Sequence, residues 1–133
     1  SRDSKRLKGE MKTILIVDDE PDIADVVVTT LQEEGYRVLA ASNGLEGLQR
    51  LSETIPDVLI CDVMMPFMDG ASMCARVRDD PKHQDMRIVI ASVMDEATLS
   101  NQFSSYDGFL RKPYRLGALL DLVATLSARS AHP

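Results

Sequence analysis

The sequence predicts an α/β fold: a doubly wound, five-stranded parallel sheet with helices on both faces. Two observations predict it. Five short apolar runs alternate with five stretches in which apolar residues recur at helical spacing, and such βα alternation is typical of a parallel sheet covered by helices. The run Val58 to Asp62 has four successive apolar residues before its carboxylate, as expected of a strand buried on both faces. Right-handed crossovers then give the doubly wound arrangement.

The first half of the chain holds three predicted strands and two predicted helices. The strands are short apolar runs at Thr13–Val17, Tyr36–Ala41 and Val58–Asp62. The helices have apolar residues three or four positions apart, and they cover Pro21–Glu34 and Leu45–Ile55. Pro21 suits a first helical turn, whereas Gly35 ends the first helix and Pro56 ends the second.

The second half holds the remaining elements. Apolar runs predict strands at Arg87–Ala91 and Gly108–Arg111. Helical spacing predicts helices at Gly70–Arg78, Asp95 to about Phe103, and Arg115–Ala128. The folded domain is therefore expected over residues 12–128, after a flexible tail or linker at 1–11 and before a frayed C-terminus at 129–133.

Composition limits the functions open to the chain. Its 133 residues predict one domain. Acidic residues outnumber basic ones 21 to 15, which argues against sequence-independent binding to nucleic acid. Cys61 and Cys74 do not make the disulfide framework of a small secreted protein. No apolar run is long enough to span a membrane and no signal peptide opens the chain, so we expect a cytoplasmic protein.

Charged and hydroxyl side chains follow four of the five predicted strands. Asp18 and Asp19 follow the first, Asp62 ends the third, Ser92 follows the fourth and Lys112 follows the fifth. Ligand sites of open parallel sheets lie at the carboxyl ends of the strands, so we expect these residues to lie together. Carboxylate oxygens with open positions suit Mg²⁺. An aspartate can attack phosphorus to form an aspartyl-phosphate, with a cation and a hydroxyl offsetting the charge of the transferring group.

Taken singly, each of these residues also has a structural explanation. Asp62 alone could form a turn, and Asp18 and Asp19 could favour the N-terminus of the helix that follows. Ser92 could cap the next helix, and Lys112 could be a solvated charge. These explanations require five residues to meet at one edge of the sheet by accident, so we favour phosphoryl transfer to an aspartate.

The sequence resembles the receiver domain of two-component response regulators over residues 12 to about 128. The residues that carry the resemblance are Ile14–Glu20, Asp62–Gly70, Ser92, Phe109–Arg111 and Lys112–Pro113. The resemblance implies the flavodoxin-like strand order 2-1-3-4-5 and a cis Lys112–Pro113 bond. It also implies a signalling domain rather than an enzyme, one that assists its own phosphorylation and slow dephosphorylation.

The resemblance implies that Asp62 is the phosphoacceptor. The phosphoryl group would come from the phosphohistidine of a sensor histidine kinase or of a histidine phosphotransfer protein. Asp18, Asp19 and Asp62 would hold Mg²⁺ together with the backbone carbonyl of Met64. Of Asp18 and Asp19, the resemblance favours Asp19 as the direct ligand of the ion.

The remaining site residues would serve the phosphoryl group and the switch. The resemblance implies that Lys112 pairs with the phosphoryl group and that Ser92 bonds one of its oxygens. Phe109 would swing inward as Ser92 is drawn to that group. A downstream protein would bind over the fourth helix, the fifth strand and the fifth helix, with no membrane and no direct contact to nucleic acid.

The chain departs from the family pattern between Ser92 and Lys112. This stretch is slightly shorter than in the family, Ser105-Tyr106 stands where Gly-Ala is usual, and Val93 stands where a smaller residue is common. We therefore expect a fourth helix that is short, displaced or partly irregular, and we expect Val93 to narrow access to the acyl phosphate.

Two other functions fit parts of the pattern. A phosphohydrolase of the haloacid-dehalogenase type also uses an aspartate nucleophile, but it usually has a second aspartate two residues later, where this chain has Met64. A receiver-like interaction module that is never phosphorylated would not need the complete acidic set. No effector segment follows Ala128, so we expect either a stand-alone receiver or a piece of a larger protein.

Overall fold

The computed structural model describes residues 11–63 and 69–128. Met64, almost all of the expected tail at 1–11 and the expected frayed end at 129–133 lie outside these residues. The elements run in chain order as β1 (Thr13–Val17), α2 (Pro21–Glu33), β2 (Arg37–Ala41), α3 (Gly44–Glu53), β3 (Val58–Asp62), α4 (Gly70–Arg78), the 3-10 helix η1 (Pro81–His83), β4 (Arg87–Ser92), α5 (Glu96–Ser100), β5 (Gly108–Arg111) and α6 (Leu116–Ala128).

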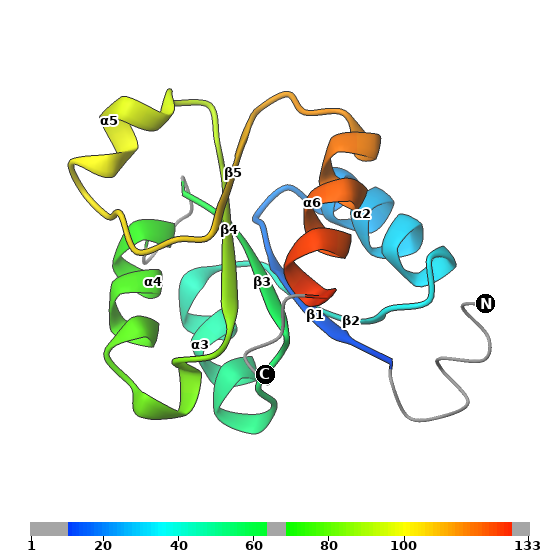
Figure 1. Cartoon of the computed structure of the whole chain (residues 1–133), viewed down its shortest axis with the longest axis horizontal. Helices are drawn as coiled ribbons and strands as arrows, with labels where there is room; N and C mark the ends of the chain where they lie inside the picture. Colours follow the sequence, from blue (N-terminus) through cyan, green and yellow to red (C-terminus); the bar gives the residue numbers. More distant parts are fainter. Residues whose placement is uncertain (1–10, 64–68, 129–133) are drawn as a thin grey trace.

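The five strands form one parallel sheet in the order β2-β1-β3-β4-β5. Helices α2 and α6 lie on one side of the sheet, and α3, α4 and α5 lie on the other (Figure 1). The predicted doubly wound fold and its strand order are therefore confirmed. Strand boundaries differ from the predicted ones by at most one residue.

Alternate residues of the strands pack into two separate hydrophobic cores, one on each face of the sheet. In β1, Ile14 and Ile16 pack with α2 and α6, whereas Leu15 and Val17 pack with the helices on the opposite face. Side chains of successive strand residues point to opposite faces, so an unbroken apolar run is what a strand covered on both sides requires. Every residue of β3 is buried for this reason.

Helix α5 has only five residues, which confirms that the fourth helix is short. It begins after Asp95, whose carboxylate accepts a hydrogen bond of 2.8 Å from the Thr98 N–H. The predicted end near Phe103 is wrong. The N–H groups of Gln102 and Phe103 both donate to the Leu99 carbonyl, so the chain tightens after Ser100 and turns Phe103 into the core. Among the described helices, none has both the length and the apolar character needed to cross a bilayer.

The guanidinium of Arg78, in the last turn of α4, joins this helix to the loop before β4 and to the chain before β5. Its Nε donates to the Ser105 carbonyl at 3.1 Å. Its Nη1 donates to the carbonyls of His83 and Met86 at 3.2 and 2.8 Å. Its Nη2 pairs with Asp107 Oδ2 at 2.8 Å. The fixed fork of donors that arginine presents suits several acceptors at once, so Arg78 fixes the chain that leads into β5.

Arg78→Ala should therefore lower the free energy of unfolding by about 2 kcal/mol, because partly buried acceptors lose their donor. Arg78→Lys should recover only part of that loss, since an ammonium cannot span the same acceptors. Urea denaturation measures both. The matched control is Arg76→Ala, an exposed arginine on the same helix, which should change stability by less than about 0.5 kcal/mol. An Arg78→Ala variant as stable as the Arg76→Ala variant would contradict this role.

Candidate functional site

Four carboxylates gather where β1 and β3 end. Asp18 follows β1 directly and Asp62 is the last residue of β3, and only 4% and 5% of their surfaces are exposed. Asp19 and Glu20 lie beside them and are exposed. One carboxylate oxygen from each of the four lies within 4.8 Å of the others. The site thus has a buried floor and an exposed rim.

Lys112 supplies the positive charge of this acidic group. Its Nζ lies 3.2 Å from Asp18 Oδ2, 3.2 Å from Asp62 Oδ2 and 3.3 Å from Glu20 Oε1. Burial opposes the charge of this ammonium, but the neighbouring carboxylates of Asp62 and Asp18 outweigh that effect and raise the pKa of Lys112. Lys112 is therefore a fixed cation at neutral pH.

Backbone hydrogen bonds hold Asp18 in place. Its N–H donates to the Ala41 carbonyl at the end of β2 at 3.0 Å. Its Oδ1 accepts a hydrogen bond of 2.8 Å from the Glu20 N–H. Its other oxygen, Oδ2, accepts a hydrogen bond of 3.2 Å from Lys112 Nζ. One oxygen of Asp18 thus bonds the residue that caps α2, as expected of a residue that favours the start of this helix, and the other bonds Lys112.

Ser92 is fully buried at the end of β4. Its carbonyl accepts a hydrogen bond of 2.7 Å from the Lys112 N–H, and its Oγ accepts one of 2.9 Å from the Met94 N–H. The cap of α5 is Asp95, not Ser92. In the sheet register Asp62 lies beside Ala91, so Ser92 is one residue beyond Asp62 at the same edge. The Lys112–Pro113 bond is cis, as the resemblance implies.

Phe109 lies in β5 opposite Ile90 and is half-buried. It packs at the margin of the core beneath α3, α4 and α5, and its ring centroid is 6.2 Å from that of Tyr106. Phe109 therefore packs in the same core as Leu99 of α5. The acidic group, in contrast, lies at the ends of β1 and β3.

Sequence reasoning did not assign a role to Glu20. The structure places its carboxylate both in the acidic group and against Lys112. The signal was its position at the end of the acidic run that follows β1. The backbone carbonyl of Met64 lies outside the described residues.

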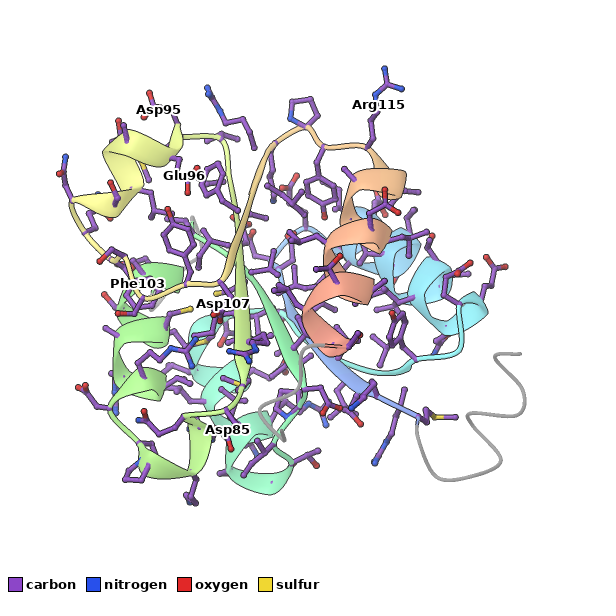
Figure 2. The ribbon with its side chains drawn as sticks, viewed as in Figure 1. Asp85, Asp95, Glu96, Phe103, Asp107 and Arg115 are labelled. Carbon is purple, nitrogen blue, oxygen red and sulfur yellow. The ribbon has the colours of Figure 1, made fainter. Side chains whose placement is uncertain are left out.

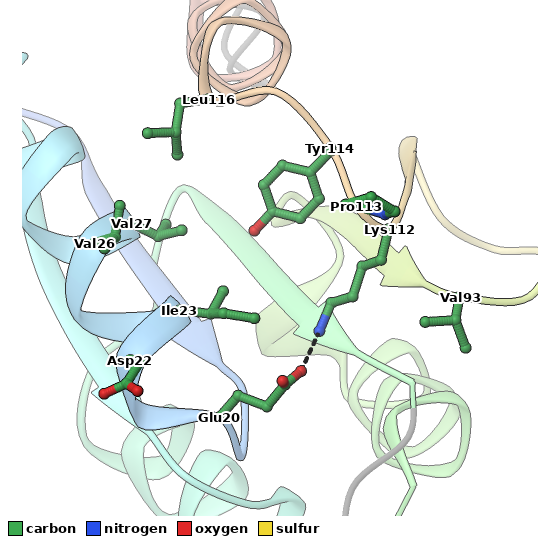
Figure 3. A pocket seen from close by; sticks show the side chains of 10 residues that line it. All are labelled: Glu20, Asp22, Ile23, Val26, Val27, Val93, Lys112, Pro113, Tyr114 and Leu116. Carbon is green, nitrogen blue, oxygen red and sulfur yellow. Dashed lines mark hydrogen bonds and ion pairs between the residues drawn. The ribbon is translucent and has the colours of Figure 1, made fainter.

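A groove of about 630 Å³ opens beside Lys112 (Figure 3). Its walls come from α2 and from the chain between β5 and α6, with the residues Glu20, Asp22, Ile23, Val26, Val27, Val93, Lys112, Pro113, Tyr114 and Leu116. Val26 and Val93 are exposed by 50% and 57%. The groove is thus mainly apolar, and the ion pair of Lys112 with Glu20 lies at one end of it.

The donors of the acidic group are all carboxylate oxygens, with no cysteine or histidine among them. Such a set fits a hard divalent cation such as Mg²⁺ rather than a metal that prefers sulfur or imidazole. A carboxylate beside a fixed ammonium also suits the transfer of an anionic group, because the developing charge meets a cation already in place. Binding of a divalent cation and phosphoryl transfer are both open to this arrangement.

The start of α4 packs directly on the end of β3. The Gly70 N–H donates to the Val63 carbonyl at 2.9 Å. A Cβ at Gly70 would overlap the carbonyl oxygen of Asp62 and would lie 2.9 Å from Cys61 Sγ. Only glycine permits this approach, so Gly70 is what allows α4 to begin in contact with the end of β3.

Comparison with known proteins links this geometry to one family. A profile of the response regulator receiver domain matches residues 14–124. The transcriptional regulatory protein TrcR of Mycobacterium tuberculosis is 34% identical over 129 residues, which are 96% of this chain and 49% of TrcR. The chain thus spans about half the length of this curated relative.

Solved structures agree with the profile. A putative response regulator from Chloroflexus aurantiacus superposes with a TM-score of 0.82 at 34% identity, over 90% of this chain and 99% of that one. The response regulator TrrA of Thermotoga maritima, solved in complex with Mg²⁺-BeF, gives a TM-score of 0.77 at 32% identity, over 87% of this chain and 99% of that one.

Gly70→Ala should lower the free energy of unfolding by about 1–3 kcal/mol, because the new methyl group forces the backbone near Asp62 to move. Gly117→Ala in α6 is the matched control, since a Cβ there meets nothing within 4 Å. That change should stabilise the chain slightly, as alanine favours a helix over glycine. Urea denaturation of both variants tests this, and equal stability of the two would contradict the close packing of Gly70 on Asp62.

Proposed function

Because the chain belongs to the response regulator receiver domain family, we propose that Asp62 accepts a phosphoryl group from a phosphohistidine. The donor would be a sensor histidine kinase or a histidine phosphotransfer protein. A carboxylate oxygen of Asp62 attacks phosphorus, the phosphorus–nitrogen bond breaks, and its electron pair remains on the imidazole. The observation that carries this proposal is the position of Lys112 Nζ, 3.2 Å from both Asp18 and Asp62.

We infer that Asp18, Asp19 and Asp62 hold Mg²⁺, with the backbone carbonyl of Met64 as a further ligand. The all-oxygen donor set supports this choice, and so does the Mg²⁺-BeF complex of the similar TrrA. When bound, the cation supplies positive charge against the oxygens of the transferring group. Glu20, at the exposed rim, remains available to Lys112.

We propose that Lys112 and Ser92 exchange their present partners for the phosphoryl group. Lys112 now contacts Asp62 directly, so a phosphoryl group on that oxygen would take over the ammonium. The Ser92 hydroxyl now accepts from Met94 N–H, and it would turn its proton towards a phosphoryl oxygen. Phe109 would follow inward and change the surface formed by α5, β5 and α6, where a downstream protein would bind.

We propose that the phosphodonor approaches over the groove beside Lys112. The groove shares Glu20 and Lys112 with the acidic site, and it offers exposed apolar surface at Val26 and Val93. Glu20 and Asp22 add negative charge to its lining. A helix with an apolar face and basic flanks would match both features. Val93 lines the same groove, which supports its expected effect on access to the acyl phosphate.

The family match does not favour the alternatives of a phosphohydrolase or of a module that is never phosphorylated. We propose a receiver domain over residues 12–128 that acts as a cytoplasmic signalling domain rather than an enzyme. It would assist its own phosphorylation and slow dephosphorylation through Lys112 and the carboxylates. The activities of the longer relatives, such as the transcriptional regulation in the name of TrcR, are possible outputs of a larger protein.

Incubation with a small-molecule phosphodonor and Mg²⁺ should add one phosphoryl group to the chain, as seen by intact mass. Asp62→Asn should abolish the addition, because an amide oxygen is a poor nucleophile, and removal of Mg²⁺ should suppress it. The control is Asp25→Asn, an exposed aspartate of α2, which should be labelled like the wild type. Labelling that persists in Asp62→Asn rejects the proposed function.

A further inference from the structure

The hydroxyl of Tyr106 joins the chain before β5 to the first residue of α5. It donates a hydrogen bond of 2.6 Å to Glu96 Oε2. This hydrogen bond and burial raise the pKa of Tyr106 to about 12, so at neutral pH the phenol keeps the proton that it donates. Figure 2 shows Glu96 on α5 and Phe103 on the segment that returns towards β5. The contact therefore ties together two segments within the stretch from Ser92 to Lys112, in which this chain departs from the family pattern.

The ring of Tyr106 contacts two other aromatic rings. Its centroid is 6.3 Å from that of Phe103 and 6.2 Å from that of Phe109, with planes tilted by 43° and 46°. These distances and tilts are within the range in which aromatic pairs attract. Phe103 is buried in the core beneath α5. The same side chain that holds α5 by its hydroxyl therefore packs its ring against Phe109.

Hydrogen bonds to Ser105 and Asp107 hold the backbone on both sides of Tyr106. Asp107 accepts hydrogen bonds from the Ile88 N–H and from Arg78, both at 2.8 Å. The Arg78 guanidinium also bonds the Ser105 carbonyl. With the backbone on both sides of Tyr106 held in this way, a movement of Phe109 or α5 must break or strain the contacts of the Tyr106 side chain.

The contact also lies between the two residues of the proposed switch. Glu96 follows Ser92 by four residues, and Tyr106 precedes Phe109 by three. Met94, whose N–H bonds the Ser92 hydroxyl, packs against the same core as Tyr106 and Phe109. A displacement that starts at Ser92 therefore reaches Glu96 along the chain and reaches Phe109 through the Tyr106 ring.

We propose that Tyr106 is a positioning residue for Phe109, and that its bond to Glu96 stabilises the arrangement in which Lys112 contacts Asp62. This inference rests on the proposed function, since it concerns how the same switch is set. A contact made in one of two states shifts their equilibrium by its differential free energy. By linkage, loss of the Tyr106–Glu96 hydrogen bond should tighten the binding of a ligand that favours the phosphorylated state.

The test uses the whole chain, with beryllofluoride and Mg²⁺ as the probe for the phosphorylated state. The dissociation constant of beryllofluoride and the amide NMR signals of Phe109 and Glu96 are measured together. Tyr106→Phe keeps the ring and removes the hydroxyl, and it should tighten binding about threefold, as expected of an exposed hydrogen bond to a charged group. In the absence of the probe, its Phe109 signal should move towards the bound position.

Four further variants make the test specific. Glu96→Ala should match Tyr106→Phe, and the double variant should show no additional effect, because both changes remove one contact. Glu96→Gln keeps an acceptor oxygen and should remain closer to the wild type. Tyr36→Phe, a half-buried tyrosine that packs on the opposite core, should leave beryllofluoride binding unchanged.

The possible failures are distinguishable. If the wild type does not bind beryllofluoride, both the proposed function and this inference are rejected. If the wild type binds it but Tyr106→Phe binds with the same affinity, the inference alone is overturned, even if that variant melts at a lower temperature. A lower melting temperature with unchanged affinity would mean that the contact only supports the fold.

Discussion

The ion pairs of Lys112 with Asp18 and Asp62 are the interaction on which the site depends. Two nearly buried carboxylates within reach of each other would repel strongly and lose their hydration. The ammonium offsets both effects, and its raised pKa is the reciprocal consequence. Because the four carboxylates of the site outnumber the one ammonium, the site still attracts cations. A group that displaces the Lys112 ammonium from Asp62 must either be positively charged itself or form a new ion pair with that ammonium.

The fold supplies the geometry for that balance. Asp18 follows β1, Asp62 ends β3 and Lys112 follows β5. The parallel arrangement brings the ends of these strands to one edge. The bond from the Lys112 N–H to the Ser92 carbonyl aligns the end of β5 with the end of β4. Gly70 then allows α4 to begin directly against Asp62. Backbone contacts therefore hold together the strand ends that carry the side chains of the site.

Sequence reasoning predicted the sheet and the residues at its edge, because both follow from local patterns. Buried runs mark the strands, and the residue after each run must lie at the carboxyl edge. The end of α5 was not predictable from spacing, since it depends on the burial of Phe103 in a core built by distant residues. The contacts of Arg78 with Ser105 and Asp107 span 27 and 29 residues. The pairing of Glu96 with Tyr106 depends on how two loops fold back, and no periodicity encodes such contacts.

We propose that the phosphoryl group resides on Asp62 as an acyl phosphate. Borohydride reduces an acyl phosphate to an alcohol, so treatment of the phosphorylated chain should convert an aspartate to homoserine, which peptide mass spectrometry can locate. We expect conversion at position 62 alone. Conversion at Asp18 or Asp19, or a stable phosphoryl group on a serine or histidine without any conversion, would contradict it.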